Sequence, residues 1–303
     1  MPIVDSWVWP APAKVNLFLH VTGRRADGYH LLQTVFQLLD LCDSITIQVN
    51  DSGRIGRSLG LPGLAAEADL AVRAAQLLKQ ATRCTQGAEI GIDKRIPAGA
   101  GLGGGSSDAA TVLVALNAMW GTQLKADQLA ALGLALGADV PVFVHGHTAW
   151  AEGVGEALTA IETADSWYVV VFPEETVSTA VVFADLALTH TTARTTIPRL
   201  LSGACGSGAS GFLADPNFRN DLQALVESRY PPVAAASKWL AGFGAARMSG
   251  SGASVFAAFA DHAEARAVAR QCPQGWSVFV ARALPHSPLL SAVQAWHEQV
   301  RNG

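Results

Sequence analysis

The sequence predicts an α+β protein that is folded as two lobes. Strand-like and helix-like segments alternate along all 303 residues, which is enough chain for two lobes or one large domain. The alternation in the second half is typical of a ferredoxin-like lobe. Residues 153–166 contain no strong strand signal. We therefore place a boundary there and expect an N-terminal lobe over 1–157 and a C-terminal lobe over 158–303.

The first half begins with strand patterns. Residues 13–20 alternate between apolar and polar side chains, so that Lys14 and Asn16 share the polar face. An Asp-Gly turn follows in the loop over 23–30. The next predicted elements are strands over 31–41 and 43–49, a helix over 67–80, a strand over 88–97, and helices over 106–120 and 126–136.

The second half begins with the apolar run 167–172, which predicts a buried strand. The elements expected after it are helices over 179–186 and 237–244, a glycine turn over 249–252, a strand over 253–260, a helix over 262–271 and a strand over 276–282.

Composition narrows the class of protein. Half of the residues are hydrophobic and 15% are charged, so the chain can bury a sizeable core and is not expected to be disordered. The net charge is -4 without a dense block of Lys and Arg, which gives no argument for a nucleic-acid or membrane partner. No apolar run reaches the roughly 20 residues of a membrane span, and no signal peptide is recognisable. We expect a cytoplasmic protein.

Metal-ligating residues are sparse. His145 and His147 lie two positions apart, but their surroundings favour ordinary polar residues of a loop over a metal pair. The cysteines form no C-x-x-C pair and are expected to be free, buried thiols rather than zinc ligands or a redox motif. They are Cys42, Cys84, Cys205 and Cys272.

The most informative segment is "PAGAGLGGGSSDAA", residues 97–110, which holds five glycines within seven positions. Glycine allows backbone N–H groups to converge on an anion, and the start of the following helix adds unpaired N–H groups and partial positive charge. Ser106 and Ser107 can donate from their hydroxyls, and Lys94 lies just upstream. We interpret the segment as a phosphate cradle. The alternative is a tight strand-to-helix turn with a serine cap, which would not require five glycines.

Other nucleotide motifs do not fit this loop. Gly99, Gly101 and Gly104 match the dinucleotide pattern G-x-G-x-x-G, but no acid-terminated parallel strand follows the next helix. The chain contains no Gly-Lys dipeptide of a P-loop and neither H-R-D nor D-F-G of protein kinases. The loop therefore indicates a nucleoside triphosphate site of a different build.

Several segments together resemble the GHMP kinases, a superfamily of small-molecule kinases. Residues 97–110 are similar to their phosphate loop and "RMSGSGASVFAAF", 247–259, to their third, glycine-rich motif. Residues 11–37 and 136–156 resemble the branch that phosphorylates a cytidine-diphosphate-linked methylerythritol. The resemblance implies a ribosomal S5 domain 2-like N-lobe, a ferredoxin-like C-lobe and an active site in the cleft between them. It also implies ATP-dependent phosphorylation of the acceptor's 2-hydroxyl in the non-mevalonate isoprenoid pathway, with Mg²⁺.

The same resemblance suggests catalytic residues. Asp139 matches the catalytic aspartate, which would accept or orient the proton of the acceptor hydroxyl. Its alternative is a helix cap, because Asp-Val-Pro is a common helix start. Lys14 matches the second catalytic position, where an ammonium would keep the carboxylate ionised. Its alternative is a surface lysine. Asn16 on the same strand face favours the site and is a candidate substrate contact.

The resemblance also suggests binding residues. Tyr29 and His30 match the cytidine-binding pair, Phe183 matches a second stacking aromatic whose alternative is the core, and Thr179 is a weaker substrate contact. Relatives often carry E-D-N-L near the adenine site, where this chain has Ala68 and Asp69 before Leu70 in place of the Asp and Asn. Asp69 is the candidate contact there. The candidate ATP-binding residues are Lys94, Pro97, Ala98, Gly99, Ala100, Gly101, Leu102, Gly103, Gly104, Gly105, Ser106, Ser107, Asp108 and Asp69.

Asp108 replaces the asparagine of some relatives, and Ser107 or Asp108 is the candidate to assist a Mg²⁺ that is bound mainly through ATP. Two other functions stay open at this point: a GHMP kinase for another small alcohol, and a nucleotide-binding relative that has lost catalysis. A degenerate relative is expected to have lost Lys14 or Asp139, and this chain has both. We expect a small-molecule substrate as the partner, and a monomer or weak homodimer.

Overall fold

The computed structural model describes residues 7–60, 63–185, 192–195 and 208–302. The first half forms β1 (Val8–Arg24), β2 (His30–Asn50), β3 (Ile55–Leu59), α1 (Leu70–Thr82), β4 (Gly87–Asp93), α2 (Gly104–Met119), α3 (Ala126–Leu134), α4 (Val140–His145), β5 (Ala149–Glu152) and β6 (Ala157–Ala160). The second half forms β7 (Trp167–Phe172), α5 (Thr179–Asp185), α7 (Gly208–Ala214), α8 (Gln223–Arg229), α9 (Pro231–Leu240), β8 (Arg247–Met248), β9 (Val255–Phe259), α10 (His262–Ala269), β10 (Ser277–Leu284) and α11 (Pro288–Asn302). The α+β prediction is confirmed.

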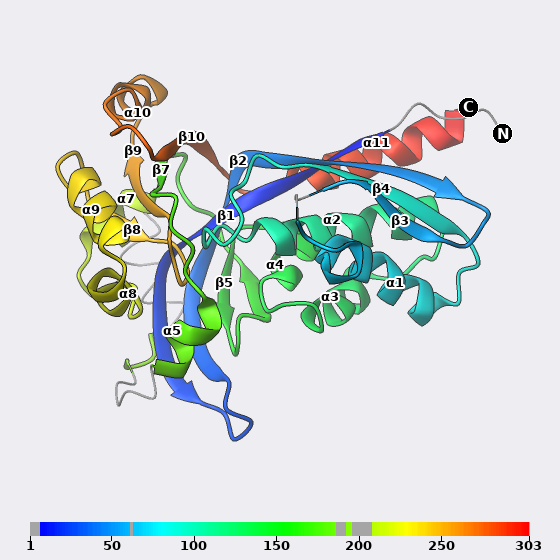
Figure 1. The fold of residues 1–303 in the computed structure, drawn as a ribbon, viewed down its shortest axis with the longest axis horizontal. Coiled ribbons are helices and arrows are strands. Elements are labelled where there is room, and N and C mark those ends of the chain that lie inside the picture. Colours follow the sequence, from blue (N-terminus) through cyan, green and yellow to red (C-terminus); the bar gives the residue numbers. More distant parts are fainter. Residues whose placement is uncertain (1–6, 61–62, 186–191, 196–207, 303) are drawn as a thin grey trace.

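The elements separate into two groups joined by a long hairpin. In Figure 1, α1 to α4 lie with β3 and β4 on one side, and α7 to α10 lie with β7 to β9 on the other. The strand order β3-β4-β2-β10-β7-β9-β8 runs through both groups, with β1 and β5 also paired to β2. The antiparallel order β10-β7-β9-β8 with helices beside it fits the ferredoxin-like expectation for the C-terminal lobe.

The hairpin of β1 and β2 belongs to both lobes. Strand β2 pairs with β4 at one end of its length and with β10 at Leu38 and Leu39. Three register shifts in β1 change which face its side chains occupy. The hairpin bends away from the sheet, and its tip projects beyond α5 (Figure 1). The projecting part of the hairpin is thereby available to form the wall of a site.

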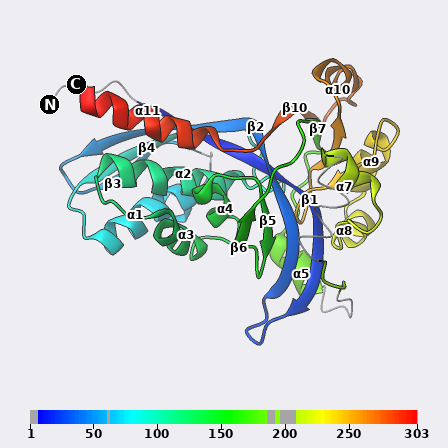
Figure 2. The same cartoon turned by 180° about the vertical axis from the view of Figure 1, so that it is seen from behind.

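The hydrophobic core has two clusters, and each uses residues from both halves of the sequence. One cluster combines Phe18 and Val35 of the hairpin with the strands and helices of the second half. The other combines α1 and α2 with Leu289 of α11, and the rings of Trp7 and Trp296 meet edge to face at 5.6 Å. Figure 2 shows α11 lying along the first-half elements. The division at 157/158 remains a prediction, because the packing of α11 and the hairpin crosses it.

Some predicted elements were wrong in extent. The two strands expected over 31–41 and 43–49 are one strand, β2, because the buried carboxylate of Asp43 is satisfied without a break in the chain. Residues 153–166 were predicted without a strand, but they contain β6, which pairs with β5. Helix α11 was not among the predicted elements.

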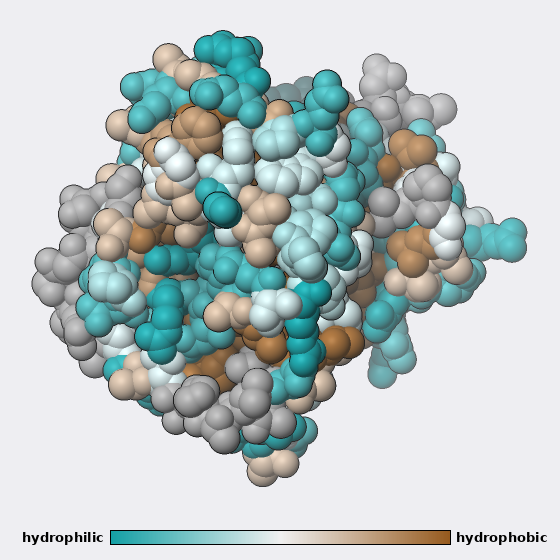
Figure 3. Space-filling view, turned by 60° about the vertical axis from the view of Figure 1, so that its left-hand side comes forward, coloured by the Kyte–Doolittle hydropathy of each residue, from teal (hydrophilic) through white to brown (hydrophobic). Residues whose placement is uncertain are grey.

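The described cysteines are free as predicted but are not fully buried, and the surface in Figure 3 is mixed in polarity. Cys42, Cys84 and Cys272 are free and partly buried, and Cys205 lies outside the described residues. Among the helices that the structure describes, none combines the length and the apolarity needed to cross a bilayer. The face drawn in Figure 3 presents its hydrophobic residues in small areas among hydrophilic ones, as is usual for surface in contact with water.

Candidate active site

A cavity of about 1020 Å³ lies where the hairpin, the glycine loop, α5 and the turn over 249–252 meet. One wall is the face of β2 that presents every second residue, from His30 to Phe36. The opposite wall includes the glycine loop and the first turn of α2. The predicted site residues that line the cavity are Lys14, Asn16, Tyr29, His30, Pro97, Ala98, Gly99, Ala100, Gly101, Gly103, Gly104, Gly105, Ser106, Asp139, Thr179 and Phe183.

Lys14 and Asp139 form an ion pair in this cavity. Lys14 Nζ lies 3.1 Å from Asp139 Oδ2, and the exposed fraction is 3% for the lysine side chain and 33% for the aspartate side chain. The surface-lysine alternative for Lys14 is therefore excluded. Asp139 does occupy the N-cap position of α4, but its side chain makes no capping hydrogen bond. Its carboxylate is turned to the cavity instead, where it can accept a proton or a hydrogen bond.

A chain of hydrogen bonds orients Lys14. Lys14 Nζ donates to Asn16 Oδ1 at 2.6 Å, and Asn16 Nδ2 donates to Thr34 Oγ1 at 2.9 Å. Thr34 Oγ1 in turn donates to the carbonyl of Phe18. Because the threonine proton is committed to that carbonyl, its oxygen accepts from Asn16, and the Asn16 amide must present its oxygen to Lys14. Thr34 was not among the predicted residues.

The glycine loop has the backbone that its composition predicts. Gly99, Gly101 and Gly103 all have positive φ, between 68° and 74°. A Cβ at Gly101 would lie 2.3 Å from the carbonyl oxygen of Ser249, so the loop and the glycine turn approach too closely for a side chain. The N–H of Lys14 donates to the carbonyl of Leu102 at 3.0 Å, which fixes the loop against β1.

Helix α2 begins at Gly104, two residues before the predicted start, because Gly103 in the left-handed conformation serves as its N-cap. Gly104, Gly105 and Ser106 therefore form its first turn and line the cavity. The unpaired N–H groups and the positive end of the helix dipole at this turn suit a phosphate group.

Aromatic side chains gather at the other end of the cavity. The rings of His30 and Phe183 lie 5.3 Å apart at 34°, and Tyr29 beside them at the hairpin tip is 66% exposed. Phe183 is half-buried against the core and also lines the cavity, so both of its predicted roles apply in part. Thr179 Oγ1 and Ser251 Oγ lie 2.7 Å apart and join α5 to the glycine turn. Exposed aromatic faces of this kind suit a planar base.

Comparison with known proteins assigns the family. The family model described as GHMP kinases N terminal domain matches residues 69–147 of this chain. The model described as GHMP kinases C terminal matches residues 213–278. The 4-diphosphocytidyl-2-C-methyl-D-erythritol kinase of Halorhodospira halophila (strain DSM 244 / SL1) is 54% identical over 290 residues, which are 94% of this chain and 96% of that protein. The chain belongs to the 4-diphosphocytidyl-2-C-methyl-D-erythritol kinase family. The protein of the same name from Xanthomonas axonopodis pv. citri (strain 306) is 51% identical over 97% of this chain and 96% of its own length.

Solved structures agree with that assignment. A crystal structure of 4-(cytidine 5'-diphospho)-2C-methyl-D-erythritol kinase matches with a TM-score of 0.78 at 34% identity, covering 91% of this chain and 98% of that one. The Methanococcus jannaschii mevalonate kinase matches with a TM-score of 0.68 at 16% identity, covering 93% and 100%, and shares the fold. The expected GHMP kinase fold is confirmed. A member of this family is an ATP-dependent small-molecule kinase.

Five of the predicted ATP-binding residues of this family member do not line the cavity: Lys94, Leu102, Ser107, Asp108 and Asp69. Leu102 is a core residue whose carbonyl holds β1. Asp69 caps α1, accepting from the N–H of Ala71 at 2.9 Å, and pairs with Arg57 at 2.7 Å. Its neighbour Leu70 lines the cavity instead. The adenine role of Asp69 remains a prediction.

Lys94 lies behind the loop in a buried triad. Its ammonium donates to Asp43, and to Asp108 Oδ2 at 2.7 Å. Asp43 Oδ1 also accepts from the N–H groups of Arg95 and Ile96 at 2.6 and 2.8 Å. Burial raises the pKa of the Asp108 carboxyl to about 7; Lys94 opposes the rise and Asp43 adds to it. The triad joins β2, the exit of β4 and α2, and so fixes where the glycine loop begins and ends.

Other residues of the site were missed because only the tertiary structure brings them there. Ser249 and Ser251 lie in a turn that the sequence identified without assigning it to the cavity. Thr34 shares the two-residue spacing of His30 and Leu32, and that alternation was the signal which could have found it. Arg24 lines the cavity near the hairpin tip.

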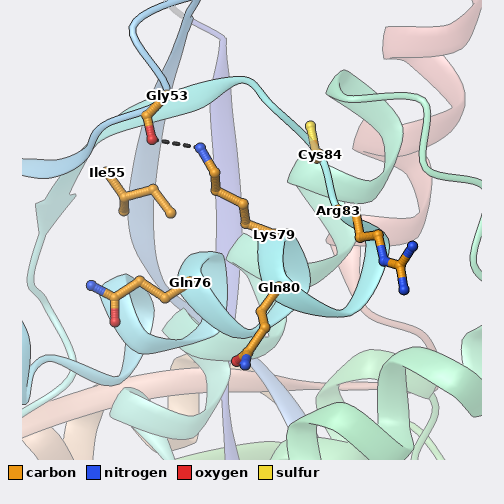
Figure 4. A pocket seen from close by; sticks show the side chains of 7 residues that line it. All are labelled: Gly53, Ile55, Gln76, Lys79, Gln80, Arg83 and Cys84. Atoms are coloured by element: carbon orange, nitrogen blue, oxygen red, sulfur yellow. Dashed lines mark hydrogen bonds between the residues drawn. The ribbon is translucent and has the colours of Figure 1, made fainter.

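The histidines considered as metal ligands and a second cavity lie outside the cavity described above. The Nδ1 atoms of His147 and His286 are 2.9 Å apart, and among the described residues no group of three or more metal-ligating side chains comes together. A second cavity of about 480 Å³ lies beside α1 (Figure 4). Lys79 in it donates to the carbonyls of Gly53, Thr85 and Gln86, which uses all three of its N–H donors. Lys79 thereby holds two connecting segments against α1. One is the β2–β3 connection at Gly53, and the other is the α1–β4 connection at Thr85 and Gln86.

Proposed function

We propose that the chain transfers the terminal phosphoryl group of ATP to the 2-hydroxyl of 4-diphosphocytidyl-2-C-methyl-D-erythritol, a step in the non-mevalonate supply of isoprenoid precursors. The observation that carries the proposal is the Lys14–Asp139 pair at one end of a cavity whose other end is lined by Tyr29, His30 and Phe183. The family membership supports the same substrate.

The dimensions of the cavity support an elongated acceptor. Six residues of extended β2 separate His30 from Phe36, which corresponds to about 20 Å at the rise of a strand. Phe36 lies beside Lys14, whose ammonium is 5.3 Å from the ring centre. A cytosine held between aromatic rings at the hairpin tip would thus leave the methylerythritol hydroxyl near Asp139.

We assign Asp139 to accept or orient the hydroxyl proton of the acceptor, and Lys14 to keep that carboxylate ionised and to stabilise the transferred charge. The burial of Lys14 and the 3.1 Å ion pair support these roles. Asn16 orients Lys14 through the hydrogen bond already described. The first turn of α2 and the loop over 97–103 receive the phosphates of ATP.

Mg²⁺ is part of the proposal, and its role is to neutralise phosphate charge. Ser107 Oγ and Asp108 Oδ1 are buried without a hydrogen-bond partner among the described residues, which leaves two oxygen atoms for a cation or water. Neither residue lines the cavity, whereas Ser106 does. This supports a Mg²⁺ held mainly through the nucleotide, with Ser106 as the serine hydroxyl on the cavity wall. The assisting role of Ser107 or Asp108 remains a prediction. Cytoplasmic location and a monomer or weak homodimer remain predictions.

The test is an ADP-release assay with ATP, Mg²⁺ and three acceptors: 4-diphosphocytidyl-2-C-methyl-D-erythritol, mevalonate and homoserine. We expect ADP release only with the cytidylyl acceptor, and phosphate on its 2-hydroxyl by phosphorus NMR. Turnover of mevalonate or homoserine alone would favour another small-alcohol kinase. ATP binding without turnover of any acceptor would favour a non-catalytic relative.

A further inference from the structure

A short segment before α8 runs beside the hairpin behind the cavity. The N–H of Leu19 donates to the carbonyl of Arg219 at 3.0 Å, and the N–H of Asp221 donates to the carbonyl of Leu19 at 2.8 Å. Leu19 lines the cavity, while Asn220, between the two bonds, is 5% exposed and does not line it. Asn220 is therefore attached to β1 through its neighbours and has its side chain directed into the protein.

The side chain of Asn220 holds a second piece of backbone. Its Nδ2 donates to the carbonyls of Met248 at 2.8 Å and Gly250 at 2.7 Å, and its Oδ1 accepts from the N–H of Leu222 at 2.9 Å. A primary amide has two N–H donors, and here both are used by carbonyls on the two sides of Ser249. A carboxylate of the same shape has no donor to offer to either carbonyl.

The segment that Asn220 holds, residues 248–251, includes most of the glycine turn and lies against Lys14 and its hydrogen-bond partner Asn16. Ser249 Oγ donates to the carbonyl of Gly101 at 2.9 Å and accepts from the N–H of Asn16 at 3.3 Å. A Cβ at Gly250 would lie 3.5 Å from Lys14 Nζ and 3.4 Å from Asn16 Oδ1. The turn therefore packs directly against Lys14, Asn16 and the glycine loop at once.

We propose that Asn220 is a positioning residue for phosphoryl transfer, whose amide holds the 248–251 turn against Lys14 and the glycine loop. This inference rests on the proposed function. Asn220 does not touch the substrates; it acts through the turn. The 248–251 turn keeps the Lys14 ammonium and the glycine loop that receives ATP in a fixed position relative to the β2 wall of the cavity. In-line transfer requires such an arrangement.

The test is Asn220→Asp, which keeps the shape and removes both donors. Two carbonyls would then face a carboxylate, so the turn should move away from Lys14. We expect kcat to fall by about tenfold or more, because a displacement of the reacting groups by about 1 Å has an effect of this size or larger. At low pH the introduced carboxyl regains a proton and one O–H donor, so the ratio of variant to wild-type kcat should rise as the pH is lowered from 8 to 6. A purely structural defect would not give that pH profile in a folded variant.

Asn217→Asp is the matched control, because Asn217 is exposed in the same segment and its side chain donates to Asp215 rather than to the turn. Its kcat and pH profile should match those of the wild type. Thermal denaturation establishes that each variant is folded. If Asn220→Asp does not fold, Ser249→Ala removes the contact of the same turn with Gly101 and should also lower kcat.

The outcomes separate the two proposals. Absence of wild-type turnover with the cytidylyl acceptor would overturn the proposed function itself. With an active wild type, an unchanged kcat in folded Asn220→Asp, or in Ser249→Ala where the first variant is unfolded, would overturn the role of Asn220. Where both variants fold, non-additive effects of the two substitutions on kcat support action through one turn, and additive effects contradict it.

Discussion

At the scale of single residues, the important contrast is between Lys14, which is buried, and Asp139, which is partly open to the cavity. Burial of an ammonium is unfavourable without partners, and Lys14 has the Asn16 oxygen and the Asp139 carboxylate. The buried Lys14 ammonium is stabilised by the Asp139 carboxylate, and that stabilisation requires both side chains. This interdependence determines what a substitution at either position should do.

Asp139→Asn should abolish transfer while ATP still binds. The amide keeps the shape but cannot accept the hydroxyl proton, so we expect kcat to fall by about 10²- to 10⁴-fold. Steady-state kinetics and calorimetric titration with ATP measure the two effects. Asp127→Asn is the control, because that side chain is 93% exposed on α3. Near-normal turnover of Asp139→Asn would contradict the assigned role.

Tyr29→Ala should raise the KM for the acceptor far more than the KM for ATP. Loss of one stacked aromatic is worth about 1–3 kcal/mol, so the acceptor KM should rise by roughly 5- to 150-fold. Tyr29→Phe keeps the ring and should leave the acceptor KM close to the wild-type value. Equal changes in both KM values of Tyr29→Ala would remove the assignment of the hairpin tip to cytidine.

At the scale of elements, the glycine loop depends on its neighbours as much as on its own residues. Phe143 of α4 and Lys14 of β1 occupy the space where a side chain at Gly103 would lie. The Asp43–Lys94–Asp108 triad lies behind the loop and holds its two ends. The loop is thereby shaped by three other elements before any nucleotide binds.

Gly103→Ala should damage the site through the loop. Its φ of +74° is unfavourable for alanine by about 1–2 kcal/mol, and the new Cβ would lie 2.8 Å from the Phe143 ring and 3.1 Å from Lys14 Cε. We expect a lower kcat/KM for ATP in steady-state assays. Gly121→Ala is the control, with φ of +63° and nothing within 4 Å, so it adds the backbone strain without the clash. Equal activity of the two variants would contradict the expected clash.

Asp108 should make stability depend on pH in a definite direction. Its folded pKa of about 7 exceeds the ordinary 3.8, so folding takes up a proton between these values and stability is lost as the pH rises through them. The free energy of unfolding of the wild type should fall, relative to Asp108→Asn, from pH 4 to pH 7. Urea denaturation at several pH values measures this difference. A difference that is constant with pH would contradict a raised pKa.

At the scale of the whole molecule, the hairpin and a buried arginine connect the two halves. Arg247 is 7% exposed; its Nη1 donates to the carbonyls of Leu17 and Phe212 at 2.9 Å, and its Nη2 donates to the carbonyl of Leu213 at 3.2 Å. Burial lowers its pKa to about 10, which leaves it charged at neutral pH. One guanidinium thus satisfies the end of α7 and a strand of the hairpin together.

Arg247→Met should destabilise the protein. The substitution leaves three buried carbonyls without donors, and we expect the free energy of unfolding to fall by about 3 kcal/mol. Urea denaturation measures the change. Arg270→Met is the control, because Arg270 is exposed at the end of α10. A loss no larger than that of the control would show that water replaces the guanidinium at these carbonyls.

The features that depend on local spacing can be predicted from the amino-acid sequence alone. Five glycines in seven positions specify a backbone with positive φ at Gly99, Gly101 and Gly103, because few other residues adopt it without strain. Alternation in the first strand placed Lys14 and Asn16 on one face, and their hydrogen bond agrees with it. The motifs also identified the family.

The partner of each of these residues depends on the tertiary fold. Lys94 lies next to the phosphate loop in sequence, but two carboxylates from β2 and α2 hold it behind the loop. Asn220 carries no motif, and its importance comes from two carbonyls about 30 positions away. Local spacing determines which way a side chain leaves its own element. Where a buried donor or charge finds its partner depends on how distant elements pack, and the glycine loop acquires its walls in the same way.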